Sequence, residues 1–427
     1  MTKVIRMSVI LPMLSFLLVS LSQSQEVAAQ QTDAERIAEI ERNIEALAAE
    51  LERMDLGDAV VDIDSGERGF GPAASRVYKI ESGLSIGGYG EFLYENYAGS
   101  KQDGTASGKK DQFDALRAIL YTGYKFNDRL LFNSEIEVEH AKEIYLEFAY
   151  VDYMFTENVG MRAGMLLAPL GLTNELHEPP IFLGTERPLT ENKIIPTTWR
   201  ENGIGLFGET ETTSWRVYTM NSLNGAKFTS SGLRGGRQKG AKALAENFGI
   251  AARWDYIGTP GLLLGASMYT GNTGQGMELN GSEIGGRVTI FDVHMDYKVN
   301  GFDLRALWAH ASVGDVHELN QANGLTGSAG IGEAMGGWFV QAGYDLLRTK
   351  TDTEAAFIPY VRYERVNTHQ GVHASYSASA SKDLTATSVG FAWKPATQVV
   401  FKGDYQMHQT GSNSGINQMN FVVGWLY

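Results

Sequence analysis

The last ten residues of the chain alternate between apolar and other side chains with a period of two. They read QMNFVVGWLY, and one parity consists of Met419, Phe421, Val423, Trp425 and Tyr427. This alternation predicts a β-strand with one face in an apolar medium, and a terminal aromatic side chain is typical of outer-membrane barrels. A strand in hydrocarbon needs backbone partners on both edges, so we expect the first strand to pair with the last and close a barrel.

Comparable alternating segments recur from residue 84 to the end of the chain, and there are sixteen of them. They are residues 84–97, 113–126, 130–139, 143–155, 159–167, 199–208, 213–221, 248–257, 262–270, 286–297, 302–313, 337–347, 355–366, 384–393, 399–409 and 416–427. The pattern predicts an all-β protein, a sixteen-stranded antiparallel transmembrane β-barrel over residues 81–427. Sixteen strands enclose a channel that wall side chains alone cannot fill.

The connections between these segments mostly alternate between short and long, although two outer connections, near His140 and Thr410, are short. Short turns are expected at 127–128, 156–158, 209–212, 259–260, 300–301, 348–354 and 395–398, and long loops at 98–111, 168–198, 222–247, 271–285, 314–336 and 367–383. Outer-membrane barrels have short periplasmic turns and longer external loops, and an even strand number returns both termini to the periplasm. A soluble sandwich or propeller does not require this alternation.

Charged residues within the strands fall mostly on the parity opposite the apolar one. Because Arg or Lys facing lipid at mid-bilayer costs about 2–4 kcal/mol, we expect the charged parity to face the lumen. This places Arg253, Asp255, Arg305, Arg362, Glu364, Lys402 and Asp404 inside. In the segment 143–155, Glu147 and Asp152 have opposite parity, so one of the two is expected near a strand end.

The third outer loop, residues 168–198, holds five of the ten prolines and several apolar residues. Fixed backbone angles and apolar anchors predict an ordered loop, folded either into the pore as its constriction or over the outside as a rigid lid. We expect the constriction, with charge on the loop facing charge on the wall. The predicted constriction residues are Glu175, Glu178, Glu186, Arg187, Glu191 and Lys193 on the loop, and Arg117 and Arg162 on the wall.

The N-terminal residues predict three further segments. Residues 1–29 have basic Lys3 and Arg6, an apolar stretch and a small-residue cleavage site, as in a secretory signal peptide. Residues 30–56 carry a heptad seam and predict a periplasmic coiled-coil helix, whose Ile-rich core favours three or more strands, although one helix packed on its own domain is an alternative. The seam residues are Ile37, Ile40, Ile44, Leu47, Leu51 and Met54. Gly-rich residues 57–80 predict a linker.

Composition narrows the class of protein. The mean hydropathy is −0.19, and beyond the N-terminus no apolar run is long enough for a membrane helix, which agrees with strands that alternate lipid-facing and water-facing residues. The absence of Cys excludes disulfides and thiolate metal sites. A net charge of −14 makes the chain a poor ligand for nucleic acid.

Motifs for other chemistry are sparse. Glu175, His177 and Glu178 have metal-ligating side chains, but NELHE lacks the i, i+4 histidine pair of a zinc helix and precedes two prolines, so no metal and no cofactor are predicted. No phosphate-binding glycine loop and no recognisable catalytic triad are present, so no enzyme activity is expected. The basic fourth loop, residues 222–247, is expected to be solvated or to contact lipopolysaccharide phosphates.

The chain resembles bacterial porins, and it is most similar to the phosphate-selective porin O and P group. The resemblance rests on the strand count, the position of the 168–198 loop, and the sequence FKGDYQ followed by an aromatic last strand. The resemblance covers about residues 84–427. It implies a homotrimeric diffusion channel in the outer membrane of a Gram-negative bacterium. The phosphate-selective members carry a ladder of Arg and Lys, whereas here Arg117, Arg162, Arg253, Arg305 and Arg362 are mixed with Glu91, Glu135, Asp255, Asp303 and Glu364.

We therefore expect an outer-membrane porin, a passive channel for small hydrophilic solutes or ions that contacts membrane lipid and lipopolysaccharide and has its N-terminal helix in the periplasm. The alternative is a cell-wall tethering protein that uses the barrel as an anchor and the N-terminal helix as its binding element.

Overall fold

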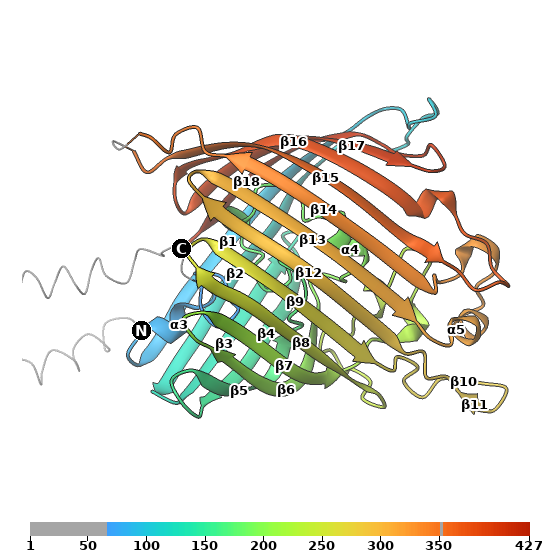
Figure 1. Ribbon diagram of the computed structural model, residues 1–427, viewed down its shortest axis with the longest axis horizontal. Helices are drawn as coiled ribbons and strands as arrows, with labels where there is room; N and C mark the ends of the chain where they lie inside the picture. Colours follow the sequence, from blue (N-terminus) through green and yellow to red (C-terminus); the bar gives the residue numbers. More distant parts are fainter. Residues whose placement is uncertain (1–65, 351–352) are drawn as a thin grey trace, which may run out of the picture. The chain divides into compact units, whose positions relative to one another are not determined.

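The computed structural model describes residues 66–350 and 353–427, and within them sixteen strands form a closed antiparallel barrel (Figure 1). The barrel strands are β1 Gly83–Tyr97, β2 Gln112–Asn127, β3 Leu130–Glu139, β4 Glu143–Met154, β5 Val159–Leu167, β6 Arg200–Glu209, β7 Thr213–Asn221, β8 Phe248–Thr259, β9 Leu262–Gly271, β12 Val288–Val299, β13 Phe302–Val313, β14 Ala334–Tyr344, β15 Ala356–Gly371, β16 Asp383–Ala396, β17 Val399–Thr410 and β18 Gln418–Leu426. The predicted fold class and strand number are confirmed.

Outside the barrel wall, the described residues contain short elements. These are α3 Arg76–Lys79, α4 Leu189–Lys193, α5 Val316–Ala322, and the small hairpin of β10 Glu278–Leu279 and β11 Ser282–Glu283. Among the described residues, no helix is long and apolar enough to cross a membrane.

The first and last strands close the barrel, as expected from the terminal pattern. β1 pairs with β18 from Tyr89 opposite Leu426 to Tyr97 opposite Gln418. The start of β1 and the end of β18 both lie at the short-turn end, because Gly83 is opposite Lys125, next to the turn between β2 and β3. The long loops therefore extend from the other end.

The two faces of the wall follow the predicted parity. On β2, Leu120, Tyr124 and Phe126 are 39–54% exposed, while Ile119 and Tyr121 are each 3% exposed. The outer face also carries exposed Trp254, Trp308, Trp338 and Trp393. The seven charged residues assigned to the lumen by parity are all buried inside. A wall with an apolar outer surface and a charged inner surface is suited to a lipid bilayer.

One of the pair Glu147 and Asp152 was expected near a strand end, and Asp152 does lie two residues before the end of β4, but a β-bulge accounts for the parity of both. Glu147 and Asp152 are both buried in the interior, at 3% and 0% exposure, although their sequence parity differs. The pairing of β3 with β4 shifts between Glu135 opposite Phe148 and Ile136 opposite Leu146, which leaves Glu147 as the extra residue. A bulge reverses the parity of the strand beyond it, so neither residue has to lie near an end.

The segment that precedes β1 is folded against the inner wall. In this N-terminal segment, residues 66–79, Phe70, Ala73, Ala74 and Val77 are 1–4% exposed. The Phe70 ring lies 5.1 Å from that of Phe148 on β4, and the Asn133 amide of β3 donates to the Ala74 carbonyl at 2.8 Å. The structure thus describes the last part of the 57–80 segment as packed, while the signal-peptide and coiled-coil predictions fall outside the described residues.

Candidate functional site

The third loop, residues 168–198, lies across the interior of the barrel. Its backbone N–H groups donate hydrogen bonds to inward-facing side chains of widely separated strands. Gly171 N–H donates to Asp292 on β12 at 3.2 Å, Thr185 N–H to Asp404 on β17 at 3.0 Å, and Leu189 N–H to Glu364 on β15 at 2.5 Å. Contacts with three distant strands require the loop to cross the lumen.

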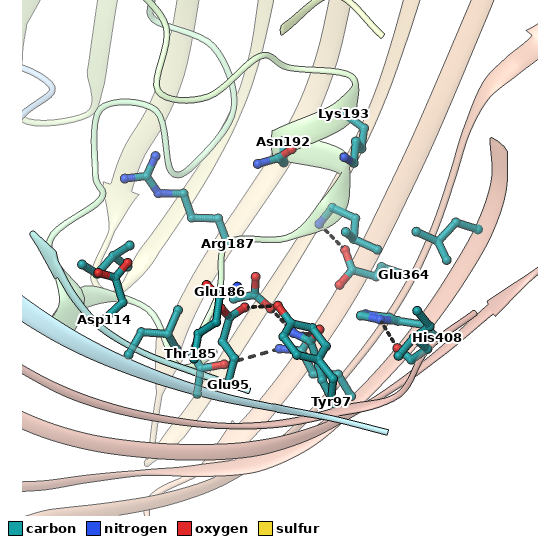
Figure 2. A pocket seen from close by; sticks show the side chains of 18 of the residues that line it. Glu95, Tyr97, Asp114, Thr185, Glu186, Arg187, Asn192, Lys193, Glu364 and His408 are labelled. Carbon is teal, nitrogen blue, oxygen red and sulfur yellow. Dashed lines mark hydrogen bonds between the residues drawn. The ribbon is translucent and has the colours of Figure 1, made fainter. Parts of the chain in front are cut away.

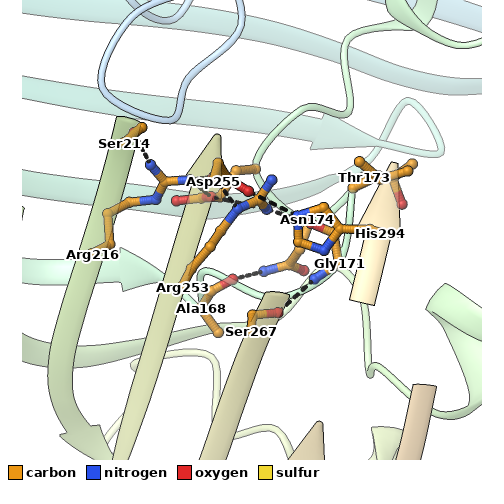
Figure 3. A network of polar contacts seen from close by, with 12 residues as sticks. Ala168, Gly171, Thr173, Asn174, Ser214, Arg216, Arg253, Asp255, Ser267 and His294 are labelled. Carbon is orange, nitrogen blue, oxygen red and sulfur yellow. Dashed lines mark hydrogen bonds and ion pairs between the residues drawn. The ribbon is translucent and has the colours of Figure 1, made fainter. Parts of the chain in front are cut away.

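A buried charge network holds the beginning of this loop (Figure 3). Gly171, whose φ of +66° favours glycine, accepts a hydrogen bond from Arg253 through its carbonyl. Arg253 Nε also pairs with Asp255 at 2.7 Å, and Arg216 bridges Glu175 at 3.0 Å and Asp255 at 3.1 Å. Glu175 of the loop is therefore shared by two wall arginines.

The same network continues through His294 of β12. Its two ring nitrogens face Asp255 at 2.9 Å and Asp292 at 2.7 Å, so only the imidazolium form donates to both carboxylates. With Arg216 and Arg253, three cations then balance Glu175, Asp255 and Asp292. A charge-balanced group of this kind attaches the loop entry to β7, β8 and β12.

A second set of contacts holds the middle of the loop on the opposite wall. Thr185 Oγ1 donates to Asp404, the Lys402 ammonium donates to the Gly184 carbonyl at 2.9 Å, and Arg362 donates to the Glu186 carbonyl at 3.2 Å. The carboxylate of Glu186 accepts from Gln418 at 2.6 Å and from Asn420 at 3.2 Å. The loop is thus attached to β15, β17 and β18 as well.

The loop lies between two polar cavities. The long-loop cavity, about 650 Å³, is lined by the loop and by strand ends next to the long loops, such as Tyr97, Gln112 and Thr410. The short-turn cavity, about 320 Å³, is lined by the N-terminal segment and by strand ends next to the short turns, such as Glu209 and Lys298.

The two cavities approach each other at consecutive loop residues. Ile181 lines the short-turn cavity, and Phe182 lines the long-loop cavity. A space of about 10 Å³, enough for about one water molecule, lies beside Phe182, Arg305 and Arg362. This small space shares Phe182 and Arg362 with the long-loop cavity.

Charges of both signs line the long-loop cavity, and Figure 2 shows Glu186, Arg187 and Lys193 of the loop among them. The six carboxylates are Glu91, Glu95, Asp114, Glu139, Glu186 and Glu364, and the six basic residues are Lys109, Arg117, Arg187, Lys193, Arg234 and Arg362. Burial raises the pKa of Glu186 to about 7, and the charges of Glu95 and Asp404 act in the same direction. The net charge of the cavity near neutral pH therefore depends in part on the carboxyl group of Glu186.

The structure brings half of the predicted constriction residues together. Glu186, Arg187, Lys193 and Arg117 all line the long-loop cavity. Arg117 is also paired there with Glu91 at 2.8 Å. These four come from the loop and from β2, as the inward parity of β2 and the middle of the loop suggested.

The other four predicted residues are buried in contacts that stabilise the loop and its surroundings. Glu175 belongs to the network of Arg216 and Arg253. Glu178 accepts from the backbone of Ala74 at 3.1 Å, and Glu191 accepts from the backbone of Leu172 and Thr173 at 2.6 Å each.

Arg162, the fourth of these, is enclosed by the N-terminal segment. It is 1% exposed, pairs with Asp152 at 2.9 Å, and donates to the Tyr78 hydroxyl at 2.7 Å. Its guanidinium also lies 4.6 Å from the Phe70 ring centroid. No sequence pattern indicates that residues preceding the barrel cover this arginine.

Arg305 and Lys402, which contact the loop at Ile181 and Phe182, were placed in the lumen by parity but were not predicted as site residues. Arg305 donates to the Ile181 carbonyl at 2.6 Å, and the Lys402 ammonium lies 3.7 Å from the Phe182 ring centroid. Gln341 and Phe339 on β14 complete the small space. Among the many inward-facing residues, these can be recognised only when the path of the loop is known.

Solved structures with the same fold are bacterial outer-membrane proteins. A loop-deletion mutant of OmpT from Vibrio cholerae aligns with a TM-score of 0.51 and 11% identity, covering 82% of this chain and 100% of that one. OmpF of Salmonella typhi, solved with daunomycin, gives 0.50 and 12%, covering 81% and 98%. The outer membrane channel DcaP of Acinetobacter baumannii gives 0.50 and 11%, covering 81% and 97%. The chain therefore has the porin-type barrel fold of outer-membrane channels.

Sequence comparison adds a family. No protein-family model matches the sequence. An uncharacterized protein of Aquifex aeolicus (strain VF5) is 35% identical over 375 residues, which is 84% of this chain and 83% of that protein. The chain belongs to the same family as this Aquifex protein.

Proposed function

We propose that the protein is an outer-membrane porin, a passive diffusion channel for small hydrophilic solutes or ions in which the third loop forms the constriction. The observation that carries the proposal is the pair of polar cavities at opposite ends of a sixteen-stranded barrel, divided by the loop at Ile181 and Phe182. The outer-membrane barrel fold and the resemblance to phosphate-selective porins support it. The proposal includes no catalysis and no energy coupling.

Vesicle swelling tests this function directly. Lipid vesicles that contain the refolded protein should swell in solutions of small sugars or amino acids, and swelling should slow as the solute becomes larger. Protein-free vesicles are the control. Vesicles with folded protein that behave like the control with every solute would contradict the proposal.

We also propose a homotrimer, on the basis of the Ile-rich heptad seam and the porin resemblance. Mass measurement in detergent tests the assembly. The expected mass is three chains, and a monomer that resists crosslinking would contradict it.

Charge reversal in the long-loop cavity is expected to change ion selectivity. Arg187→Glu or Lys193→Glu replaces a positive charge with a negative one where the channel is narrow and poorly screened, so the cation-to-anion permeability ratio should rise several-fold. The measurement is the reversal potential in a salt gradient. Lys242→Glu, on the exposed surface of the fourth loop, is the matched control. Equal shifts in all three variants would place the selectivity barrier elsewhere.

Selectivity is also expected to change with pH because the pKa of Glu186 is about 7. Below that pH the carboxyl group is neutral and the cavity carries one negative charge fewer, so lowering the pH from about 8 to about 6 should shift the reversal potential toward anions. The groups that act on Glu186 are Glu95 on β1, Asp404 on β17 and Arg362 on β15.

The control for this pH effect is Glu186→Gln. Because two histidines, His140 and His408, also line the cavity, the variant and the wild type are compared over the same pH range. The difference between wild type and variant isolates the glutamate. Identical pH profiles would contradict its role.

A further inference from the structure

Three buried side chains that carry metal-ligating atoms converge where the third loop meets β3 and β4. His177 of the loop, Glu135 of β3 and Glu147 of β4 are 2%, 0% and 3% exposed. His177 Nε2 lies 3.4 Å from Glu135 Oε1 and 3.6 Å from Glu147 Oε2. The three ligand atoms all lie within 4.8 Å of one another.

The Nδ1 atom of His177 faces a backbone carbonyl, so Nε2 is the ring nitrogen that faces the two carboxylates. Nδ1 lies 3.1 Å from the Asn174 carbonyl oxygen, which can only accept, so Nδ1 carries a proton. Nε2 then either carries a second proton or presents a lone pair toward Glu135 and Glu147. In a metal-binding histidine, the ring nitrogen that does not bind the metal commonly donates to a backbone carbonyl, as Nδ1 does here.

The distances discriminate between these two forms. A charge-assisted N–H···O hydrogen bond is about 2.7–2.9 Å long, and both observed separations are longer. In a tetrahedral site with metal–ligand bonds of about 2.0–2.2 Å, ligand atoms lie about 3.3–3.6 Å apart. The two separations from His177 Nε2 fall within this second range, and the three ligand atoms lie within 4.8 Å of one another.

Among the described ion pairs, the arginines near this cluster pair with other carboxylate oxygens. Arg200 pairs with Glu147 through the other oxygen, Oε1, at 2.7 Å, and Arg117 pairs with Glu91 and Glu137. Glu135 has no arginine partner among the described ion pairs, and its Oε2, like Oε2 of Glu147, has no hydrogen-bond partner there. An unpaired buried carboxylate is costly, and a cation at this point would neutralise it.

The β-bulge in β4 contributes to the same arrangement. Glu147 is the extra residue of the bulge, and its side chain is turned inward there beside that of Phe148. In a regular strand, Glu147 and Asp152 would face opposite sides of the wall; the bulge allows both to face the interior. Bulges commonly re-aim side chains at functional sites.

We propose that His177, Glu135 and Glu147 bind a divalent metal ion of the zinc type, which connects the third loop to the β3–β4 wall. One imidazole and two carboxylates form a ligand set that suits Zn²⁺, whereas Mg²⁺ and Ca²⁺ prefer oxygen ligands alone. Such an ion would attach the loop at a third point, between the Arg253 network and the Asp404 contacts. Because the ligands are buried, the ion would be acquired during folding.

Metal analysis of the full-length chain tests the proposal. The protein is refolded with Zn²⁺, freed of excess metal and analysed for bound zinc, and Co²⁺ substitution provides a visible spectrum that reports tetrahedral coordination. We expect one ion per chain. His177→Gln and Glu135→Gln should each weaken binding by at least about 100-fold, since each removes a direct ligand.

A double variant, His317→Gln with His373→Gln, is the matched control, because these two rings stack at 4.6 Å in the loops and offer a competing pair of ligands. It should retain the bound ion. Circular dichroism verifies folding, and two independent ligand variants protect the test against the failure of either one to fold. Absence of stoichiometric zinc, equal binding of Mg²⁺, or unchanged affinity in the folded ligand variants would overturn the proposal.

Discussion

Arg253→Met should destabilise the folded barrel by about 3–5 kcal/mol, the usual cost of removing one partner from a buried ion pair. Arg253 is 3% exposed and contacts Asp255, Glu175 and the Gly171 carbonyl. Methionine fills most of the same volume but supplies no donor. Glu175 and Asp255 would then share Arg216 as their remaining arginine, and the loop entry would lose its carbonyl contact.

Unfolding by urea in lipid vesicles measures this loss of stability. Arg365→Met is the control, because Arg365 forms a hydrogen-bonded pair with Asp383 at 2.7 Å but its side chain is 53% exposed. An exposed pair contributes at most about 1 kcal/mol. Similar losses in both variants would show that the buried network does not fix the loop as described.

Replacing residues 176–187 by a Gly-Ser sequence of the same length should raise single-channel conductance several-fold. The replacement keeps Glu175 and its network but removes Ile181, Phe182 and the polar contacts of Thr185 and Glu186 to β17 and β18. The two cavities would then join, because these consecutive apolar residues divide them. A flexible replacement should also make the open current noisier.

Replacement of residues 278–283, the exposed hairpin of β10 and β11, is the control for this experiment. This hairpin lines neither cavity, so conductance should remain at the wild-type value. If the loop replacement also leaves conductance unchanged, the third loop does not limit passage through the barrel.

The barrel could be predicted from sequence because its determinants are local. The alternation in residues 418–427 fixed which side chains face outward, and Met419, Phe421 and Val423 are indeed 38–45% exposed. Closure followed from the requirement to pair both strand edges in hydrocarbon. The same logic failed at Glu147, since a bulge changes the parity within a strand and has no strong composition signal.

The site could be predicted only in part because it depends on long-range contacts. Parity correctly placed Arg117 and Arg162 inward, but it did not distinguish Arg117, which lines a cavity, from Arg162, which is covered by Phe70 and Tyr78. On the loop, Glu186 and Glu191 are both glutamates, and the sequence does not distinguish their roles. The path of the backbone decides that Glu186 lines the cavity, while Glu191 binds backbone N–H groups.

Planar-bilayer recording of the wild-type protein tests the central claim most directly. If the barrel is a passive channel, addition of the refolded protein should produce stepwise, long-lived conductance increases at both polarities. The presence of folded protein in the membrane is verified by the difference in electrophoretic mobility between unheated and boiled samples. A membrane that contains folded protein and remains sealed at all voltages would contradict the account.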